Sequence, residues 1–268
     1  MHKYIEAMDP RPDAPPMAAA DARPGGGRLT AAAHWLARCR PRAGGRCAVC
    51  LGWCAGDLCT HCHARFAFAV PRCPGCALAL PGGASAGDGA PCIRCRLAPP
   101  PWARAVAGVD YGYPWDRLLA DFKFHQRLDA VGALLQPLLA RLQAERGGGL
   151  RVVAVPLSRE RLRERGYNQS WELARRLARA LALEARADAL FRVRDTGHQL
   201  GLQRGARQRN LQGAFVVTPR HAAWVRGARI ALVDDVLTTG ATANAATHTL
   251  RAAGAREVQV WTVARTPE

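Results

Sequence analysis

The stretch RIALVDDVLTTGATANAATHTLRAAGA, residues 229–255, indicates the fold of this chain. An apolar run ends in two acids, Asp234 and Asp235, and a loop with three threonines and a glycine leads into an Ala-rich segment that favours a helix. Similar segments alternate around it. We expect strands at 105–113, 151–157, 213–218, 229–236 and 257–265, and helices at 115–124, 128–146, 168–183 and 241–255. Strands that alternate with helices predict an α/β fold with a mainly parallel sheet.

The loop after the two acids has the properties of a phosphate site. At the start of the helix, backbone N–H groups lack helical partners and the dipole adds positive charge. The phosphate-binding candidates are Thr238, Thr239, Gly240, Ala241 and Thr242. Ligands of parallel sheets bind beyond the carboxyl ends of the strands, where Asp234 and Asp235 would accept hydrogen bonds from sugar hydroxyls. The stretch therefore predicts a sugar-phosphate site. The alternative is an ordinary strand–turn–helix connection, capped by Thr242 or Asp235.

Residues 154–170, AVPLSRERLRERGYNQS, predict a second anion site. A strand ends near Val155, and arginines then alternate from residue 159 to residue 165. Guanidinium groups bind diphosphates in a bidentate manner, so we expect a loop here that places them beside the ribose site. The pyrophosphate-binding candidates are Pro156, Leu157, Arg159, Arg163 and Arg165. The alternative is a solvated basic turn and the start of a helix.

Residues 195–215 are polar and contain glycines, which predicts a flexible loop. A loop of this kind closes over a substrate and excludes water, or it is an ordinary surface loop. We keep both interpretations open at this point.

Eight of the ten cysteines form four Cys-x2-Cys pairs. Each such turn places two thiolates on one metal ion, and two turns complete a tetrahedral zinc site. We expect two structural zinc ions held by consecutive pairs. The ligands are Cys47, Cys50, Cys59 and Cys62 at the first site, and Cys73, Cys76, Cys92 and Cys95 at the second. Interleaved pairing, the loss of one site and redox-active pairs are the alternatives. Cys54 has no partner in this scheme, and the aromatic residues Trp53, Phe66, Phe68 and Trp102 either fill the small core or stack on bases.

The composition favours partners that carry phosphate groups. The net charge is +17, although nearly all of the cations are arginines, which indicates a bias of composition. The apolar fraction of 49% suffices for a core. Because no apolar run is long enough for a membrane span and the N-terminus lacks the apolar part of a secretory signal, we expect no membrane insertion and a cytoplasmic location.

The motif at 230–242 resembles the ribose-phosphate signature of the type I phosphoribosyltransferases. Further runs make residues 47 to 265 similar to the competence protein F (ComF) family of bacteria. These runs are Arg165-Gly166-Tyr167-Asn168-Gln169, the spacing of Thr196, Gln199 and Leu202, and Arg207-x-x-Asn210-x-x-Gly213-Ala214-Phe215. Lys123-Phe124 also matches a pair in that family, but the glycine expected soon afterwards is replaced by residues of the run His125-Gln126-Arg127.

The resemblance implies a type I phosphoribosyltransferase fold that binds phosphoribosyl pyrophosphate and Mg²⁺. A composition rich in Pro, Ala and Gly predicts a disordered tail at 1–28. We expect a short helix and a double zinc ribbon at 29–100, and a phosphoribosyltransferase-like domain at 101–268. The flexible loop would contribute Gln199, Arg207 and Asn210. No residue is assigned a catalytic role. The family is linked to natural transformation, so a protein that binds single-stranded DNA or a DNA-translocating helicase without catalysis is an alternative, as is a sensor of phosphoribosyl pyrophosphate.

Overall fold

The computed structural model describes residues 44–80, 90–146, 148–193 and 213–267. The expected tail at 1–28, the expected helix at 29–38 and the loop candidates Gln199, Arg207 and Asn210 lie outside these residues. None of the described helices is long and apolar enough to cross a membrane.

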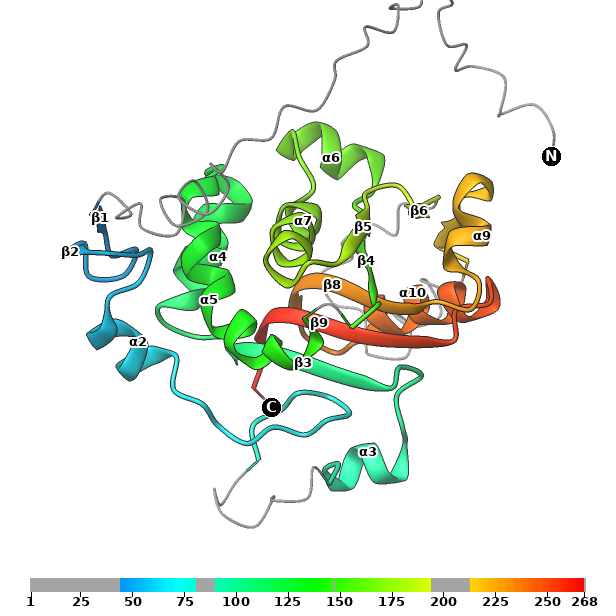
Figure 1. Ribbon diagram of the computed structural model, residues 1–268, viewed down its shortest axis with the longest axis horizontal. Coiled ribbons are helices and arrows are strands. Elements are labelled where there is room, and N and C mark those ends of the chain that lie inside the picture. Colours follow the sequence, from blue (N-terminus) through cyan, green and yellow to red (C-terminus); the bar gives the residue numbers. More distant parts are fainter. Residues whose placement is uncertain (1–43, 81–89, 147, 194–212, 268) are drawn as a thin grey trace, which may run out of the picture. The chain divides into compact units, whose positions relative to one another are not determined.

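Five parallel strands form the main sheet, in the order β3-β9-β8-β4-β5 (Figure 1). The strands are β3 (Arg104–Asp110), β4 (Arg151–Ala154), β5 (Glu184–Arg186), β8 (Arg229–Leu237) and β9 (Glu257–Arg265). The central strand is β8, in which Val233 pairs with Ala154 of β4 and with Trp261 of β9. The expected α/β fold with a parallel sheet is confirmed.

Two details of the sheet differ from the expectation. The short edge strand β5 was not predicted, because three residues give no periodic signal. The strand expected at 213–218 is β7 (Phe215–Val217), and it pairs antiparallel with β6 (Leu190–Arg192) in a separate two-stranded sheet.

Helices cover both faces of the main sheet (Figure 1). Side chains of strand residues alternate between the faces, and each face has its own apolar cluster. One face packs against α4 (Trp115–Phe124), α5 (Val131–Arg141) and α7 (Gln169–Leu181), and the other against α10 (Ala241–Ala252) and α9 (Ala222–Val225). Three 3₁₀ turns complete this part: η1 (Leu128–Ala130), η2 (Gln143–Glu145) and η3 (Pro219–His221). The expected helix at 128–146 is the shorter helix α5 with η1 before it and η2 after it, and Pro137 lies inside α5.

The arginine-rich segment is a helix, α6 (Arg159–Arg165), and our expectation of a loop there was wrong. The Ser158 hydroxyl caps its start by accepting a hydrogen bond from the Arg161 amide, and Gly166 ends it with φ of 75°. On a helix, arginines two positions apart point in opposite directions. The alternation that suggested one anion-binding loop therefore separates the arginines into two groups.

The Cys-rich segment comprises two small modules. The first contains β1 (Gly45–Arg46), β2 (Trp53–Cys54) and α2 (Thr60–Phe66), and Leu58 and Cys62 join the apolar cluster that includes α4 and α5. The second contains α3 (Ile93–Leu97). Trp102, which follows it, is buried and donates a hydrogen bond from Nε1 to the Gly75 carbonyl at 2.7 Å.

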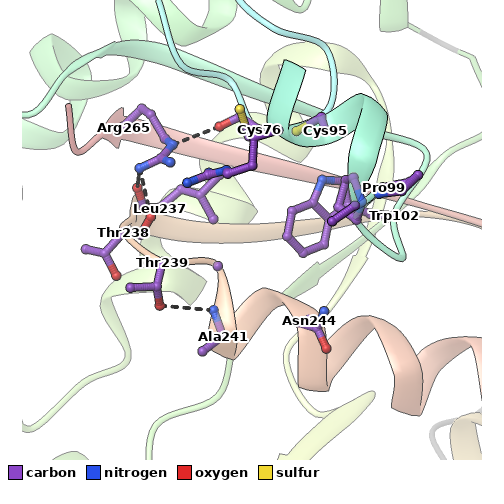
Figure 2. A pocket seen from close by; sticks show the side chains of 14 residues that line it. Cys76, Cys95, Pro99, Trp102, Leu237, Thr238, Thr239, Ala241, Asn244 and Arg265 are labelled. Carbon is purple, nitrogen blue, oxygen red and sulfur yellow. Dashed lines mark hydrogen bonds between the residues drawn. The ribbon is translucent and has the colours of Figure 1, made fainter. Parts of the chain in front are cut away.

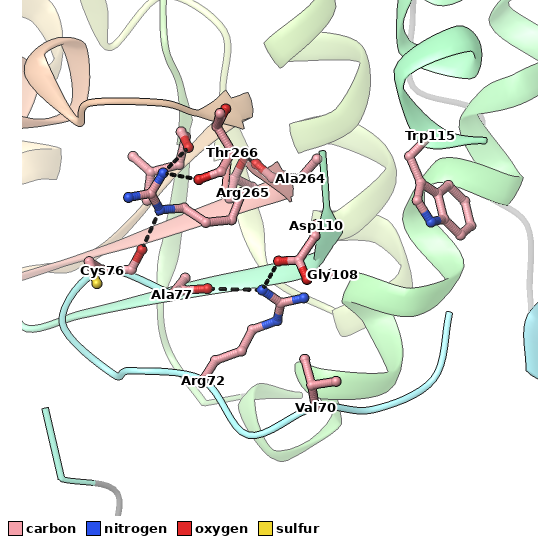
Figure 3. A network of polar contacts seen from close by, with 12 residues as sticks. Val70, Arg72, Cys76, Ala77, Gly108, Asp110, Trp115, Ala264, Arg265 and Thr266 are labelled. Atoms are coloured by element: carbon pink, nitrogen blue, oxygen red, sulfur yellow. Dashed lines mark hydrogen bonds and ion pairs between the residues drawn. The ribbon is translucent and has the colours of Figure 1, made fainter. Parts of the chain in front are cut away.

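The second module is fixed to the ends of two sheet strands (Figure 3). Arg72 forms an ion pair with Asp110 at the end of β3, with a separation of 2.6 Å, and also binds the Ala77 carbonyl. Arg265, the last residue of β9, donates to the Cys76 carbonyl at 2.8 Å. The module therefore lies at the carboxyl edge of the sheet, where ligands of parallel sheets bind.

Candidate functional site

Asp234 and Asp235 lie near the carboxyl end of β8, and both are half-buried. Oδ1 of Asp234 accepts hydrogen bonds from the Ser170 hydroxyl at 3.0 Å and from the Asp235 amide at 2.9 Å. Oδ2 of Asp235 forms an ion pair with Nζ of Lys123 at 2.8 Å. Among the described residues, the other oxygen of each carboxylate has no hydrogen-bond donor. The pair therefore keeps two acceptor oxygens for a ligand.

The environment of Asp234 favours its neutral form. Burial raises the pKa of this carboxyl to about 7, and the negative charge of Asp235 adds to the effect. Hydrogen bonds from the Asp235 amide and Ser170, together with the charge of Lys123, act in the opposite direction. An acid whose pKa lies near neutrality is typical of a binding or catalytic site.

The turn between α6 and α7 positions this acid pair. Asn168 caps α7 by accepting from the Trp171 amide, and its Nδ2 holds the Val155 carbonyl at 3.1 Å. That arrangement directs Ser170, in the first turn of α7, at Asp234. The Tyr167 hydroxyl binds the Phe122 carbonyl in α4, next to Lys123. The run 165–170 thus positions the Ser170 hydroxyl, which contacts Asp234, and through Tyr167 it also contacts α4, whose Lys123 contacts Asp235.

The loop at 238–240 leads from β8 into α10, as predicted. Gly240 precedes the helix with φ of 80° and offers no side-chain cap. The Ala241 amide has only a long contact, 3.4 Å, to the Thr239 hydroxyl. The first amides of α10 therefore remain available to an anion. An alanine at position 240 would be strained by its φ, and its Cβ would lie 3.0 Å from the Trp102 ring.

Four of the five phosphate-loop candidates, Thr238 to Ala241, line a cavity of about 310 Å³, whose opposite wall is the second Cys module (Figure 2), and Thr242 is not among its lining residues. Leu237 and Asn244 complete the wall on the sheet side, and Trp102, Pro99 and Cys95 lie opposite them. Arg265 joins the two walls: besides Cys76 it binds the carbonyls of Leu237 and Thr238, at 3.0 and 2.7 Å. One buried guanidinium therefore fixes both the loop and the Cys module.

The cysteines meet in two groups of four, with the consecutive pairing that we expected. Interleaved pairing is excluded, because the ligand atoms of each group lie within 4.8 Å of one another. The sulfurs of Cys50 and Cys59 are 3.8 Å apart, and those of Cys76 and Cys92 are 3.7 Å apart. This is close to the edge of about 3.8 Å that a tetrahedron with metal–sulfur distances of about 2.3 Å requires. Both groups fit a tetrahedral metal ion.

Backbone amides favour the charged form of one sulfur in each group. The Cys59 amide lies 3.4 Å from the Cys47 sulfur, and the Cys92 amide 3.2 Å from the Cys73 sulfur. Burial tends to raise the pKa of the Cys47 thiol, but amide hydrogen bonds outweigh it and lower the pKa to about 6. The same opposing effects lower the pKa of Cys73 to about 7. Cys54 lies outside both groups and donates to the Gly56 carbonyl instead.

The pyrophosphate candidates do not form one site. Pro156 and Leu157 follow Val155, whose amide binds the Val233 carbonyl, so they lie at the sheet edge beside the acids. Arg159 and Arg163 line a cavity of about 410 Å³ together with Phe191. Arg165, together with Arg161, lines another cavity, of about 350 Å³, on a different side of α6. The proposed role of these residues stays a prediction.

Gln126 has the backbone conformation that the expected glycine after Lys123-Phe124 would favour. This residue has φ of 54°, the left-handed conformation that favours glycine. The chain thus keeps the turn after α4 with a residue that is strained there. We expect Gln126→Gly to raise the free energy of unfolding by up to about 1 kcal/mol in chemical denaturation. Gln126→Val should lower it, and a stabilising valine would contradict this reading of the turn.

Sequence reasoning did not assign the residues that connect the site. Ser170 had a signal, since it follows the run 165–169, but nothing in the sequence relates it to Asp234. Arg265 had none, because a terminal arginine in an arginine-rich chain is indistinguishable from a surface residue. Trp53 and Phe68 are exposed, whereas Trp102 is buried and Phe66 packs on the first apolar cluster. Of the two interpretations of these aromatics, the core-filling one therefore holds for Trp102 and Phe66 and not for Trp53 and Phe68.

Comparison with known proteins identifies relatives over most of the chain. The DNA utilization protein YhgH of Salmonella typhimurium is 38% identical over 214 residues, which cover 78% of this chain and 90% of that protein. The protein of the same name from Escherichia coli is 40% identical over 66% of this chain and 78% of the relative. Competence protein F of Haemophilus influenzae is 36% identical over 65% of this chain and 78% of its own length.

Solved structures give a weaker similarity. The glutamine phosphoribosylpyrophosphate amidotransferase from B. subtilis, complexed with ADP and GMP, is 20% identical with a TM-score of 0.35. An allosteric regulatory enzyme of purine biosynthesis is 21% identical with a TM-score of 0.34. Each match covers 54% of this chain, which spans about 30% of those structures. No family model matches the chain. The identity and coverage shared with the YhgH proteins and Competence protein F show that this chain belongs to the competence protein F (ComF) family.

Proposed function

We propose that the chain binds phosphoribosyl pyrophosphate with Mg²⁺ at the carboxyl edge of its sheet, in a role connected with competence and DNA utilization. The observation that carries the proposal is the arrangement of β8 and α10. Two half-buried carboxylates each keep a free oxygen, and the strand that bears them runs into a helix start whose amides have no strong cap. A ribose 5-phosphate group has two hydroxyls and a terminal phosphate in the matching order.

In this proposal the side chains of the chain bind and orient the ligand. The free oxygens of Asp234 and Asp235 accept hydrogen bonds from the two ribose hydroxyls. The amides of residues 239–242 donate hydrogen bonds to the 5-phosphate. Pro156 and Leu157 lie beside the acids, where the diphosphate would extend. Mg²⁺ would supply positive charge to the diphosphate oxygens. With the ribose held by the two aspartates, a nitrogen nucleophile would attack its C1. No described group is assigned as a base.

We also propose that both Cys groups hold structural zinc. Their sulfur separations fit zinc, and four thiolates leave no open position for a substrate. A cytoplasmic location, where reduced thiols persist, agrees with this role.

Calorimetry with phosphoribosyl pyrophosphate and Mg²⁺ tests the proposal. We expect saturable binding with one site per chain, and weaker but measurable binding of ribose 5-phosphate, which lacks the diphosphate. Gly240→Val should abolish both signals, because a branched side chain is strained at this φ and meets Trp102. The absence of heat from the folded wild-type chain would refute the proposal. Release of pyrophosphate in the presence of a panel of amines and bases tests turnover separately.

Ligand binding should strengthen as the pH rises through about 7, the pKa of Asp234. An ionised carboxylate accepts hydroxyl hydrogen bonds more strongly than a neutral acid. Because the pKa of Asp234 is raised in the folded state, its neutral form adds to the free energy of unfolding at low pH. This contribution is lost as the pH rises through about 7 and Asp234 ionises. Between about pH 6 and about pH 8 we expect a gain in affinity of roughly five- to tenfold. The same titration on Asp234→Asn should show a much flatter profile, and an equal slope in both proteins would exclude Asp234 as the titrating group.

A second candidate function is binding of single-stranded DNA without catalysis. The names of the relatives and the net charge of +17 favour it. Retardation of a labelled single strand in a gel, measured at two salt concentrations, should show a steep loss of affinity at the higher concentration if phosphates are the contacts. A DNA-translocating helicase would be a partner in this role.

A further inference from the structure

The cavity that Lys123 and Arg165 line adjoins the acid pair, and the proposed function assigns no ligand to it. Its volume is about 350 Å³, enough for one small organic ligand. The turn after α4 and one side of α6 form its walls. The lining residues are Lys123, Phe124, Gln126, Arg161, Glu164 and Arg165.

The cavity offers a flat aromatic surface. The Phe124 ring is 66% exposed, although Phe122, two residues earlier, is completely buried. The Arg165 guanidinium carbon lies 5.3 Å from the centroid of the Phe124 ring. The guanidinium lies over the ring, and a planar ligand can stack on an exposed phenyl ring or on a guanidinium group.

The charge of the cavity favours an anion. Three cations and one carboxylate line it, and only Lys123 has its charge matched at short range, by Asp235. Arg165 donates to the neutral oxygen of Gln169 at 3.2 Å. Arg161 forms no ion pair with any residue in the described part of the chain. Two arginines therefore remain to bind an anionic group, against the single charge of Glu164.

Lys123 places the cavity next to the proposed ribose site. Its ammonium group binds Asp235, while the same residue lines the cavity. We propose that this cavity binds the acceptor of the reaction, and that the acceptor is a planar nitrogen heterocycle with an anionic group. This inference rests on the proposed function. A ring nitrogen donates its lone pair to C1 of the ribose, and the C1–O bond breaks and its electrons leave with the diphosphate. A ring nitrogen that carries a proton releases it to water, and a pyridine-type nitrogen, which carries none, keeps a positive charge in the product.

Two matched pairs of heterocycles test the assignment by calorimetry. Orotate and nicotinate carry the anionic group, and uracil and nicotinamide are planar rings without it. We expect at least one anionic ring to bind saturably and about tenfold more tightly than its neutral partner. Phe124→Leu should weaken that binding about tenfold and Arg161→Gln about fivefold. Phe68→Leu, at another exposed phenylalanine, is the control and should bind as the wild type does.

The variants separate failure of this inference from failure of the proposed function. Phe124→Leu should keep its affinity for phosphoribosyl pyrophosphate, and Asp234→Asn should bind phosphoribosyl pyrophosphate more weakly while it binds the anionic ring as the wild type does. If neither anionic ring binds, or if Phe124→Leu and Phe68→Leu behave alike, the assignment of the cavity is overturned. If the ring binds and depends on Phe124, but the chain does not bind phosphoribosyl pyrophosphate, the cavity would still be a site for anionic heterocycles. The heterocycle would then not be the acceptor of this reaction.

Discussion

Replacement of both Asp234 and Asp235 by asparagine is expected to weaken binding of phosphoribosyl pyrophosphate by at least about 100-fold, or about 2.7 kcal/mol. Each carboxylate offers one free oxygen, and hydrogen bonds to a charged acceptor contribute about 1.5–3 kcal/mol each. An asparagine oxygen still accepts a hydrogen bond but has no charge. Calorimetry at about pH 8, where Asp234 is mostly ionised, measures the loss.

The control for this experiment is the stability of the free protein. Asp234→Asn removes a half-buried carboxyl whose ionisation is unfavourable, so its free energy of unfolding at about pH 8 should rise by about 1–2 kcal/mol. If Asp234→Asn binds the ligand more weakly but unfolds less readily, Asp234 contributes to ligand binding and not to the stability of the fold. Unchanged affinity in the double variant would show that the ribose does not lie at these acids.

The second large effect is expected at the second Cys group. Cys73→Ser with Cys76→Ser should remove one zinc ion, lower the free energy of unfolding by about 4 kcal/mol or more, and weaken phosphate binding by at least about tenfold. The reason is Arg265, which binds the carbonyls of Cys76, Leu237 and Thr238 together. If the Cys module loses its shape, the phosphate loop loses its support. Metal analysis, denaturation and ligand titration give the three readouts.

A matched pair of variants isolates this connection from general unfolding. Cys47→Ser with Cys50→Ser should also lose one zinc ion, but the folded fraction should bind the ligand normally, because the first Cys group packs near α4 and α5. Arg265→Met keeps the eight cysteines of the two Cys groups and should still bind two zinc ions, while its affinity for phosphate should fall. Normal binding by Arg265→Met would mean that the loop does not need the Cys module.

The sequence predicts those parts of the fold whose signals are local. The helix at 115–124 and the strand at 257–265 were expected with the bounds that the structure has, because their apolar periodicity is long and undisturbed. The Cys-x2-Cys turns predicted that each pair shares one metal site, and the consecutive combination of pairs that we expected is confirmed, although spacing alone left interleaved pairing open. The α6 helix was missed because alternating arginines resemble a basic loop, although Ser158 and Gly166 are its capping residues.

The connections within the site could not be predicted, because they join residues far apart in the chain. Ser170 contacts Asp234, and Lys123 contacts Asp235, across 64 and 112 positions respectively. The approach of the Cys module to the phosphate loop depends on Arg265, which lies 189 positions from Cys76. Periodicity and spacing carry no information on such contacts. These contacts follow only from the order of the strands in the sheet.

Backbone amide NMR of the ¹⁵N-labelled chain, titrated with ribose 5-phosphate, tests the central claim most directly. If the turn between β8 and α10 holds the 5-phosphate, the amides of Thr239, Gly240, Ala241 and Thr242 should shift saturably with one affinity. The amides around Arg161 and Phe124 should move little. Saturable shifts confined to the arginine-lined cavities, with the residues 239–242 unmoved, would contradict the account.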